Sequence, residues 1–402
     1  MISLAVSLRV MVPVLGARSV AKVIAVFDAL FNFAHGRIPC ANTIDLWVRK
    51  CGLGIYQNSA QEFSGQDYCL IADESMMIGS VKLLVILAAR AWNAGRPLTH
   101  DDVSVVGISV AASFSGESIR RELEAAAERI GHAPEYVITD NASIMTKAAS
   151  LAGVRHHPDI SHTIGVYLEH AYKEEEDFKQ YCKLMSGVVF RKNMKQVAYI
   201  LPPRQRTIAR FINMSQWVKW SGRVLQVFPK LGDAEKEALM FVPQNASLVE
   251  ELSDTIGCID TIEKEIKHNG LSADTARHCM SLVKKTLYVG NERMRKVGED
   301  IELYLRKESG WIGDEAHNCS SDILESTFGY FKLVKSPNKL YGVTTMVLHI
   351  PVREKIGSLW VPEERNIIQH VEAVRCRDIK QWKDDNLPRN LVTVRNRTLN
   401  ES

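Results

Sequence analysis

The sequence lacks the features that mark exported, membrane-spanning and zinc-stabilised proteins. Its eight cysteines include no Cys-x-x-Cys pair, and none stands at a short zinc-binding spacing from a histidine. No apolar run reaches the roughly 18 to 20 residues needed to cross a bilayer. The apolar start, 1–16, carries Arg9 and lacks the charge–apolar–cleavage layout of a signal peptide, so it predicts a helix. We therefore expect a cytoplasmic protein with free thiols and no membrane partner.

Charge is nearly balanced over the whole chain but unevenly distributed along it. The 402 residues are 46% hydrophobic and 24% charged, an ordinary globular composition, and the net charge is only +3. Yet the 53 residues of 178–230 contain eleven Lys or Arg and no Asp or Glu. The acid-rich stretch 233–265 offsets this excess. A local surplus of this size favours contact with phosphate, whereas a solvated helical face is the alternative interpretation.

The N-terminal block, 1–66, is predicted to be helical. In 20–33 the apolar residues recur at spacings of three and four, as in an amphipathic helix: Val23, Val26, Phe27, Leu30 and Phe31. A second helix, 41–50, follows a break at 35–39 and is expected to end at Gly52. Helix, turn and helix predict a helix-turn-helix-like DNA-binding block, with Arg49 and Lys50 on its outer side. Two ordinary packed helices fit the same pattern.

The period then changes to that of strands. Short apolar runs at 68–73, 81–89 and 103–110 predict an antiparallel meander, followed by a helix, a strand at 136–140, a helix, a strand at 154–159 and a further helix. The predicted order is β-β-β-α-β-α-β-α, an α/β fold with a mixed sheet in 67–171. The strand signal disappears in 172–311, which predicts a large all-helical insertion. Core completion is expected in 312–370, and 371–402 is predicted to be a polar, poorly ordered tail.

Two of the predicted strands end in a carboxylate. Asp73 follows Leu70-Ile71-Ala72, and Asp140 follows Val137-Ile138-Thr139. Two buried carboxylates on neighbouring strands repel each other unless a cation lies between them. Mg²⁺ or Mn²⁺ suits such oxygen ligands. Asp140 also fits a simpler role, as a cap for the helix that begins near Ala142.

A third carboxylate is expected to complete such a site. Glu325 is the best candidate, on a predicted helix where Asp322 shares its face. Two metal ions roughly 3.5 to 4 Å apart would then bind a scissile phosphate between them. The chain between Asp140 and Glu325 is long, and Glu308, Glu315 and Asp322 are the competing candidates.

These motifs and their order resemble those of the DDE transposases, whose catalytic core has a ribonuclease H-like fold. The matching residues are Ile71-Ala72-Asp73, Thr139-Asp140-Asn141 and Asp322-Ile323-Leu324-Glu325, together with the D-x-x-H motif Asp159-Ile160-Ser161-His162 of a large subset of these enzymes. The resemblance implies that Asp73, Asp140 and Glu325 bind the metal. His162 would contact the scissile phosphate or a leaving group, and Asp159 would orient it. Taken alone, His162 is more typical of a surface or capping histidine.

The resemblance also implies partners. The insertion would contact double-stranded DNA at transposon ends, with these candidates: Arg191, Lys192, Lys195, Arg204, Arg206, Arg210, Trp217 and Trp220. For each tryptophan a place in a core is the favoured alternative to base stacking. We expect a nucleoid-associated homodimer or larger assembly on transposon-end and target DNA. The alternatives are a structure-specific nuclease of the same fold and a decayed derivative that only binds DNA.

Overall fold

The chain folds into two compact units. The computed structural model describes residues 1–402 except 76, 193–195, 204–210, 212–213, 360–365 and 401–402. The first unit comprises Met1–Trp92, Leu98–His157 and Ser320–Ser402, and the second comprises Asn93–Pro97 and Pro158–Cys319. The fold is α/β, with a mixed five-stranded sheet and 66% helix. The predicted boundaries at 66 and 370 lie inside the first unit, and the predicted insertion, 172–311, lies inside the second.

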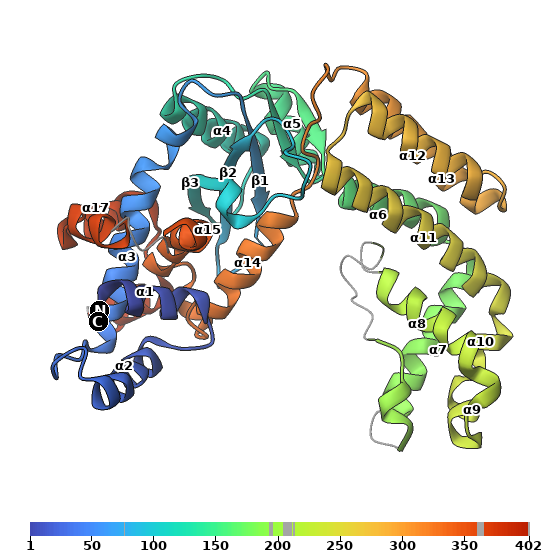
Figure 1. Ribbon diagram of the computed structural model, residues 1–402, viewed down its shortest axis with the longest axis horizontal. Coiled ribbons are helices and arrows are strands. Elements are labelled where there is room, and N and C mark those ends of the chain that lie inside the picture. The colour runs from blue at the N-terminus through green and yellow to red at the C-terminus, as the bar shows by residue number, and fades with distance from the viewer. Residues whose placement is uncertain (76, 193–195, 204–210, 212–213, 360–365, 401–402) are drawn as a thin grey trace. The chain divides into compact units, whose positions relative to one another are not determined.

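The sheet of the first unit has the strand order β3-β2-β1-β4-β5 (Figure 1). Its strands are β1 (Tyr68–Glu74), β2 (Lys82–Arg90), β3 (Val103–Ala111), β4 (Tyr136–Thr139) and β5 (His156–Pro158). β2 runs antiparallel to both β1 and β3, whereas β4 runs parallel to β1. All five predicted strands are present in the predicted order. The mixed sheet predicted from the sequence is thereby confirmed.

One face of the sheet is covered by α4 (Gly116–Ile130) and α5 (Ser143–Leu151). Side chains at alternate strand positions, such as Leu70, Ala72 and Val137, join the core between the sheet and these helices. Successive strand residues point to opposite faces. Asp73, one residue after Ala72, therefore belongs to the face that α4 and α5 leave uncovered.

The other helices of the first unit come from the two ends of the chain. They are α1 (Ile2–Met11), α2 (Ala17–Phe31), α3 (Ala41–Asn58), α14 (Asp322–Val334), α15 (His349–Leu359), α16 (Asn366–Ala373), α17 (Cys376–Asn386) and α18 (Leu391–Asn400), with short 3-10 turns η1 (Ser59–Phe63), η2 (His100–Asp102), η5 (Lys339–Tyr341) and η6 (Thr345–Leu348). The prediction of a poorly ordered tail is wrong, because α17 and α18 occupy it. Both helices are largely exposed, so the polar composition that suggested disorder is that of a solvated helix surface.

The predicted end of α3 at Gly52 is also wrong. The helix continues to Asn58, and Gly52 is buried in its interior. A Cβ atom at this position would lie 1.8 Å from the carbonyl oxygen of Leu348. Gly52 therefore serves a close helix-to-backbone approach rather than a helix stop. The predicted helix is present as α2, so its apolar residues do recur at helical spacing. Four of them, however, are exposed rather than packed: Val26, Phe27, Leu30 and Phe31.

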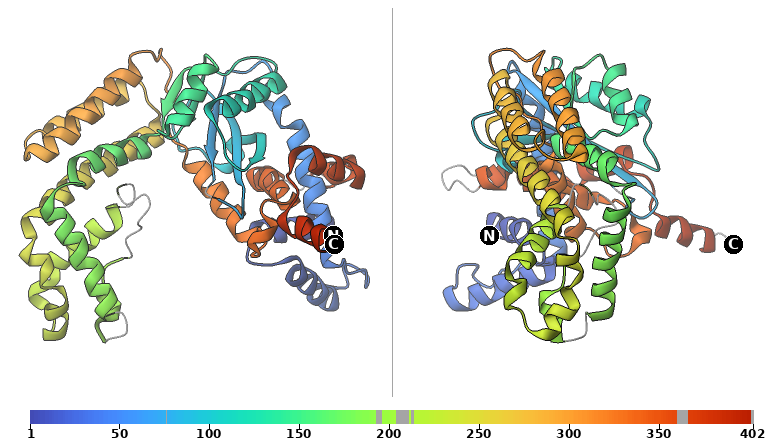
Figure 2. Two further views of the ribbon diagram at one scale, coloured as in Figure 1. Left: turned by 180° about the vertical axis from the view of Figure 1, so that it is seen from behind. Right: turned by 90° about the vertical axis from the view of Figure 1, so that its right-hand side faces the viewer.

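The second unit consists of helices around one apolar core (Figure 2). They are α6 (Ile160–Tyr172), α7 (Glu176–Lys192), α8 (Met214–Val227), α9 (Asp233–Leu239), α10 (Phe241–Gln244), α11 (Ala246–Asn269), α12 (Ala273–Thr286) and α13 (Glu292–Ser309), with turns η3 (Gln196–Ile200) and η4 (Phe228–Lys230). The described residues here form helices, turns and a single isolated bridge between Leu271 and His317. Of all the helices described in the chain, none has the length and apolar character to cross a membrane.

Candidate active site

The register of β1 and β4 brings Asp73 and Asp140 to the same level of the sheet. Ile71 lies opposite Ile138 in this parallel pair. Asp73 stands two residues further along β1, and Asp140 directly follows Thr139, the last residue of β4. They share the sheet face opposite α4 and α5, on strands about 4.8 Å apart. Both acids therefore stand at the same end of the β1–β4 pair, and both are half-buried.

Asp140 makes the local hydrogen bond expected of a residue that caps the start of α5. Its Oδ1 accepts the backbone N–H of Ala142 at 3.1 Å, just before α5 begins. A carboxylate has two oxygens and several acceptor sites, so a capping role leaves room for a second ligand. The strand before it is held on its other side, where Thr139 Oγ1 is 2.8 Å from His156 Nε2 of β5. These hydrogen bonds fix the backbone on both sides of Asp140, at the end of β4.

Glu325 lies on α14, which packs against β1 (Figures 1 and 2). Among the described residues, α14 contributes nothing to the core on the α4–α5 side, so it belongs to the face of Asp73 and Asp140. Glu325 and Asp322 both lie in the first turn of α14, three residues apart and on one side of it. Both side chains are exposed. Their carboxylates also suit the positive N-terminal end of the helix dipole.

A hydrogen-bonded clamp fixes the turn of α14 that follows Glu325. His100 of η2 has its Nε2 3.1 Å from Ser326 Oγ and its Nδ1 2.5 Å from Glu354 Oε2. Glu354, on α15, is fully buried and also accepts a hydrogen bond of 2.7 Å from Thr327 Oγ1. The clamp could not be predicted from the sequence, because its members come from three distant segments of the chain.

The order serine, histidine, carboxylate is also that of an acyl-transfer triad. Such a site needs backbone or side-chain donors for the oxyanion. Ser326 lies inside α14, where its own N–H and those of the residues after it donate within the helix. We therefore interpret Ser326, His100 and Glu354 as a clamp that positions α14.

Asp159 and His162 belong to the second unit, directly after β5. Asp159 is fully buried and caps α6, its Oδ1 accepting the backbone N–H of His162 at 2.8 Å. Its backbone carbonyl accepts the hydroxyl of Thr163 at 2.6 Å. Asp159 is therefore the N-cap of α6, a role that was not expected for it from the sequence. The predicted D-x-x-H function of this pair stays a prediction.

The competing third acids differ in their settings. Glu308 is buried on α13 of the second unit, and Glu315 is exposed in the same unit. Asp322 remains a direct competitor of Glu325, because both lie in the first turn of α14. In the described part of the chain, no three His, Cys, Asp or Glu side chains converge as a metal-binding group. The structure therefore has Asp73 and Asp140 at one end of the β1–β4 pair and two acids, Asp322 and Glu325, on the helix that packs against β1.

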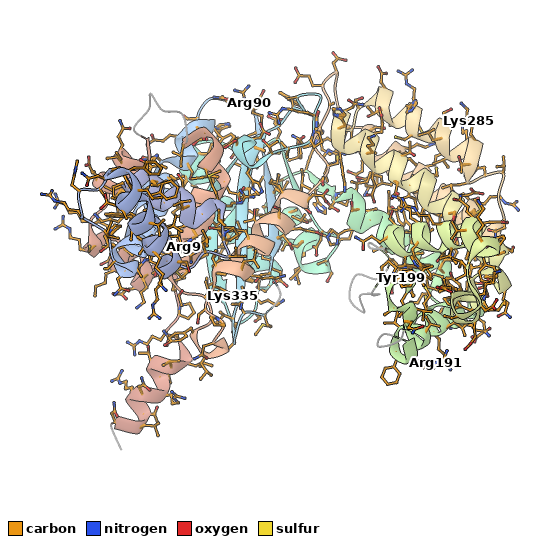
Figure 3. All side chains as sticks on the ribbon, turned by 60° about the horizontal axis from the view of Figure 1, so that its bottom comes forward. Arg9, Arg90, Arg191, Tyr199, Lys285 and Lys335 are labelled. Atoms are coloured by element: carbon orange, nitrogen blue, oxygen red, sulfur yellow. The ribbon has the colours of Figure 1, made fainter. Side chains whose placement is uncertain are left out.

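The basic segment of the second unit is partly neutralised by acids outside it. Lys179 pairs with Glu174 at 3.0 Å and Lys219 with Asp260 at 2.6 Å. Arg191 is exposed near the end of α7, as is Tyr199 in η3 (Figure 3). Four predicted DNA contacts lie outside the described residues: Lys195, Arg204, Arg206 and Arg210. Nothing is described of the side chain of Lys192.

Trp217 and Trp220 do not serve as free stacking platforms. Trp217 is 3% exposed and packs within the core of the second unit, so its prediction as a DNA contact is wrong. Trp220 is half-buried, stacks on Phe241, and donates from Nε1 to the Ile200 carbonyl at 3.1 Å. The alternative considered for both residues, a place in the core, is the one that their environments support.

α3 does not have the free outer face of a recognition helix. It packs against α1, α2, α15, α16 and α17. Lys50 is half-buried, with its Nζ 3.4 Å from the Val371 carbonyl of α16. Arg49 donates to Asp45 O at 3.0 Å and to Thr345 Oγ1 at 3.4 Å. The predicted open outer side is therefore wrong, because segments from both ends of the chain pack around α3 and leave Arg49 and Lys50 half-buried; contact of these residues with DNA stays a prediction.

Comparison with known proteins adds no family assignment. No model of a known protein family matches the chain, and a search of curated proteins gives no match.

Proposed function

We propose that this chain is a DDE-type transposase with a ribonuclease H-like core, which cuts DNA and joins it in a metal-dependent reaction. One observation carries the proposal: Asp73 near the end of β1 and Asp140 directly after β4 stand at the same end of a parallel strand pair, and α14, the helix of Glu325, packs against β1. The order of strands and helices in the first unit supports the same fold.

The donor chemistry fits Mg²⁺ or Mn²⁺. Asp73 and Asp140 would hold the cation from the sheet, with Glu325 from α14 as the third ligand. When bound, it would activate an attacking water or 3′-hydroxyl and stabilise the leaving oxygen of the phosphate. The backbone fixes the two aspartates, and the Ser326–His100–Glu354 clamp fixes the helix of the third acid. No covalent intermediate with the protein is required.

Double-stranded DNA is the proposed substrate and the nucleoid the proposed place of action. Pairing of two transposon ends would require a dimer or larger assembly. Exposed cations of the second unit, such as Arg191, support contact with DNA outside the catalytic face. The alternative of a structure-specific nuclease of the same fold would use the same carboxylates but perform no strand transfer.

The test is a strand-cleavage assay on the sequence that flanks the gene, with Mg²⁺ or Mn²⁺. Asp140→Asn is the informative variant, because asparagine keeps an oxygen for the Ala142 N–H and removes only the charge. We expect its cleavage rate to fall by at least about a hundredfold, equivalent to roughly 3 kcal/mol of transition-state stabilisation.

Glu325→Gln and Asp322→Asn form a matched pair within one helical turn. We expect the first to abolish cleavage and the second to retain most of it. The reverse result would move the third ligand to Asp322. Unchanged cleavage by Asp140→Asn, or no cleavage by the wild type, would refute the proposed function. Joining of the cut 3′ end to a second duplex separates the transposase from the nuclease.

A further inference from the structure

The predicted tail closes a cavity in the first unit, far along the chain from the acids of the sheet. The cavity has a volume of about 720 Å³ and lies between α3, the segment before and within η6, α17 and the start of α18. Buried apolar side chains, Val343 and Ile379, form part of its wall. A cavity of this size takes a small-molecule ligand or a segment of a polymer.

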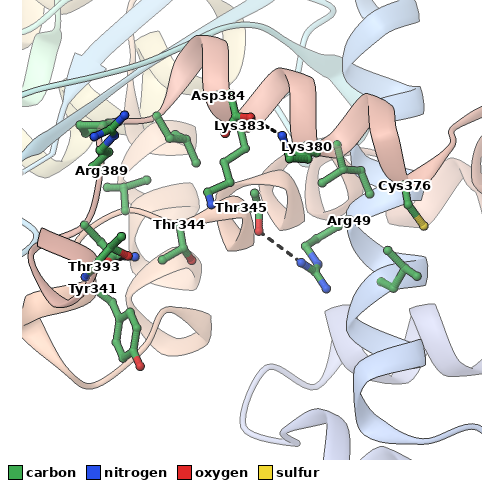
Figure 4. Close-up of a pocket in the computed structure, with 16 residues that line it drawn as sticks. Arg49, Tyr341, Thr344, Thr345, Cys376, Lys380, Lys383, Asp384, Arg389 and Thr393 are labelled. Atoms are coloured by element: carbon green, nitrogen blue, oxygen red, sulfur yellow. Dashed lines mark hydrogen bonds and ion pairs between the residues drawn. The ribbon is translucent and has the colours of Figure 1, made fainter. Parts of the chain in front are cut away.

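Cations dominate the charged lining of this cavity. Arg49, Lys380, Lys383 and Arg389 line it, against a single carboxylate, Asp384. Lys380 is paired with Asp384 at 3.0 Å. Figure 4 shows Lys383 extending from α17 into the space, with the Arg49 guanidinium on the opposite side. The net positive charge is thus held by Arg49, Lys383 and Arg389.

These three cations retain capacity for an anion. Lys383 and Arg389 form no ion pair with any carboxylate in the described part of the chain. Arg49 uses one donor on Asp45 O and one on Thr345 Oγ1, out of the five that a guanidinium offers. The hydroxyls of Thr344, Thr345 and Thr393 also line the cavity. Cations beside hydroxyls and an apolar wall are the usual surroundings of a bound phosphate and its attached sugar.

The arrangement suits a chain of phosphates better than one isolated anion. The cations come from three separate places, α3, α17 and the turn before α18, and Figure 4 shows Arg389 and Arg49 at opposite ends of the cavity with Lys383 between them. Tyr341, 38% exposed, stands among the lining residues as a surface for a sugar or a base. α18 continues the positive charge outward with Arg395 and Arg397, both exposed.

We propose that the cavity lined by Arg49, Lys383 and Arg389 binds the phosphate backbone of DNA, as a site separate from the catalytic carboxylates. The choice of DNA rests on the proposed function, whereas the preference for phosphate rests on the lining residues. Phosphate contacts of this kind set the position of a duplex without reading its sequence.

The experiment measures binding of a fluorescently labelled duplex of arbitrary sequence to the full chain, by anisotropy in EDTA. The test variant is Lys383→Gln/Arg389→Gln. Its control, Arg121→Gln/Arg377→Gln, removes the same charge from α4 and α17 at side chains 70% and 75% exposed, neither of which lines the cavity. Unchanged thermal melts establish that both variants fold.

We expect the test variant to lose about ten- to a hundredfold in affinity near 0.1 M salt. The slope of log affinity against log salt, between roughly 50 and 200 mM, should fall by about 2. The control should stay close to the wild type. Equal losses in the two variants would overturn the proposal, as would binding of inorganic phosphate that responds to the test substitutions while DNA affinity does not.

Failure of this inference is distinguishable from failure of the proposed function. EDTA removes the cation, so the binding measurement contains no catalytic step. A chain that binds duplex through the cavity but does not cleave it would retain this inference and lose the transposase. If the wild type cleaves DNA but Lys383→Gln/Arg389→Gln binds duplex as tightly as the wild type, the proposed function stands and this inference fails.

Discussion

Replacing Gly52 by alanine tests the contact that joins the N-terminal and C-terminal parts of the first unit. In an isolated helix this substitution is favourable, because alanine forms helices better than glycine by about 1 kcal/mol. In α3 the added Cβ would lie 1.8 Å from the Leu348 carbonyl oxygen and 2.8 Å from its carbon. The two effects have opposite signs, so the sign of the measured change identifies the larger one.

The magnitude follows from the contact. A carbon and a carbonyl oxygen normally approach to about 3.3 Å, so α3 and η6 must separate by roughly 1.5 Å. The obstacle is backbone, which cannot rotate away as a side chain would. Overpacking costs about 1–3 kcal/mol, and a backbone clash belongs at the upper end. After the gain in helix propensity, we expect a net destabilisation of about 2 kcal/mol, or a fall in Tm of about 4–8 °C for this unit.

Two measurements distinguish local from general effects. Thermal melting reports the change in stability, although a two-unit chain need not melt in one transition. Hydrogen exchange should show faster exchange in α3 and in the segment around Leu348 than in the helices of the second unit.

Gly329→Ala is the matched control. Gly329 lies in α14 of the same unit, and its added Cβ would meet nothing within 4 Å. We expect it to stabilise the unit by about 0.5–1 kcal/mol. If Gly52→Ala raises stability by the same amount, α3 does not approach Leu348 as the structure has it.

Two further predictions concern side-chain networks. In the second unit Arg293 bonds Asp177 at 2.8 Å and the largely buried Glu251 at 2.7 Å, and its hydrogen bonds hold the pKa of Asp177 below the usual value. Because the pKa of Asp177 is lower in the folded state, the ion pair stabilises the unit above the unfolded pKa near 4, and this stability is lost as the pH falls through the lower folded pKa. Arg293→Gln should remove this pH dependence in melts at acid pH. At neutral pH it should destabilise the unit by about 1–3 kcal/mol. If Ser326 is a clamp rather than a nucleophile, a fluorophosphonate probe should leave the protein unlabelled, and labelling abolished by Ser326→Ala would instead establish a serine hydrolase.

Local periodicity was sufficient to predict the sheet and the positions of Asp73 and Asp140 relative to two of its strands. A short apolar run that leads to Asp73 or Asp140 predicts a strand, and the alternation of side chains predicts which face of the sheet each residue joins. The register of the parallel pair then sets which residues lie opposite each other. The third acid is less determined, because Asp322 and Glu325 occupy the same turn and only a ligand chooses between them. The helices that both ends of the chain contribute to the first unit could not be placed from local sequence. Which side of a helix is buried depends on partners hundreds of residues away.

The errors share that origin. Gly52 resembles a helix stop when only its neighbours in sequence are considered, and a close approach when Leu348 is known. Trp217 lies in a basic stretch of sequence but in an apolar core in space. The clamp around Glu354 and the cavity beside Lys383 combine residues from both ends of the chain. A single sequence read in windows contains no sign of either.

The packing of α3 against α15, α16 and α17 has a consequence for how the protein is made. Residues near position 50 find their neighbours near 350 and 370, so the first unit has many contacts of very long sequence separation, which slow folding. During synthesis the whole second unit leaves the ribosome before these partners exist. A nascent chain that has not yet reached residue 320 has β1 and β4, but it lacks the helix of the third acid. A complete set of the proposed ligands therefore exists only after synthesis has passed residue 325 and the whole second unit has been made.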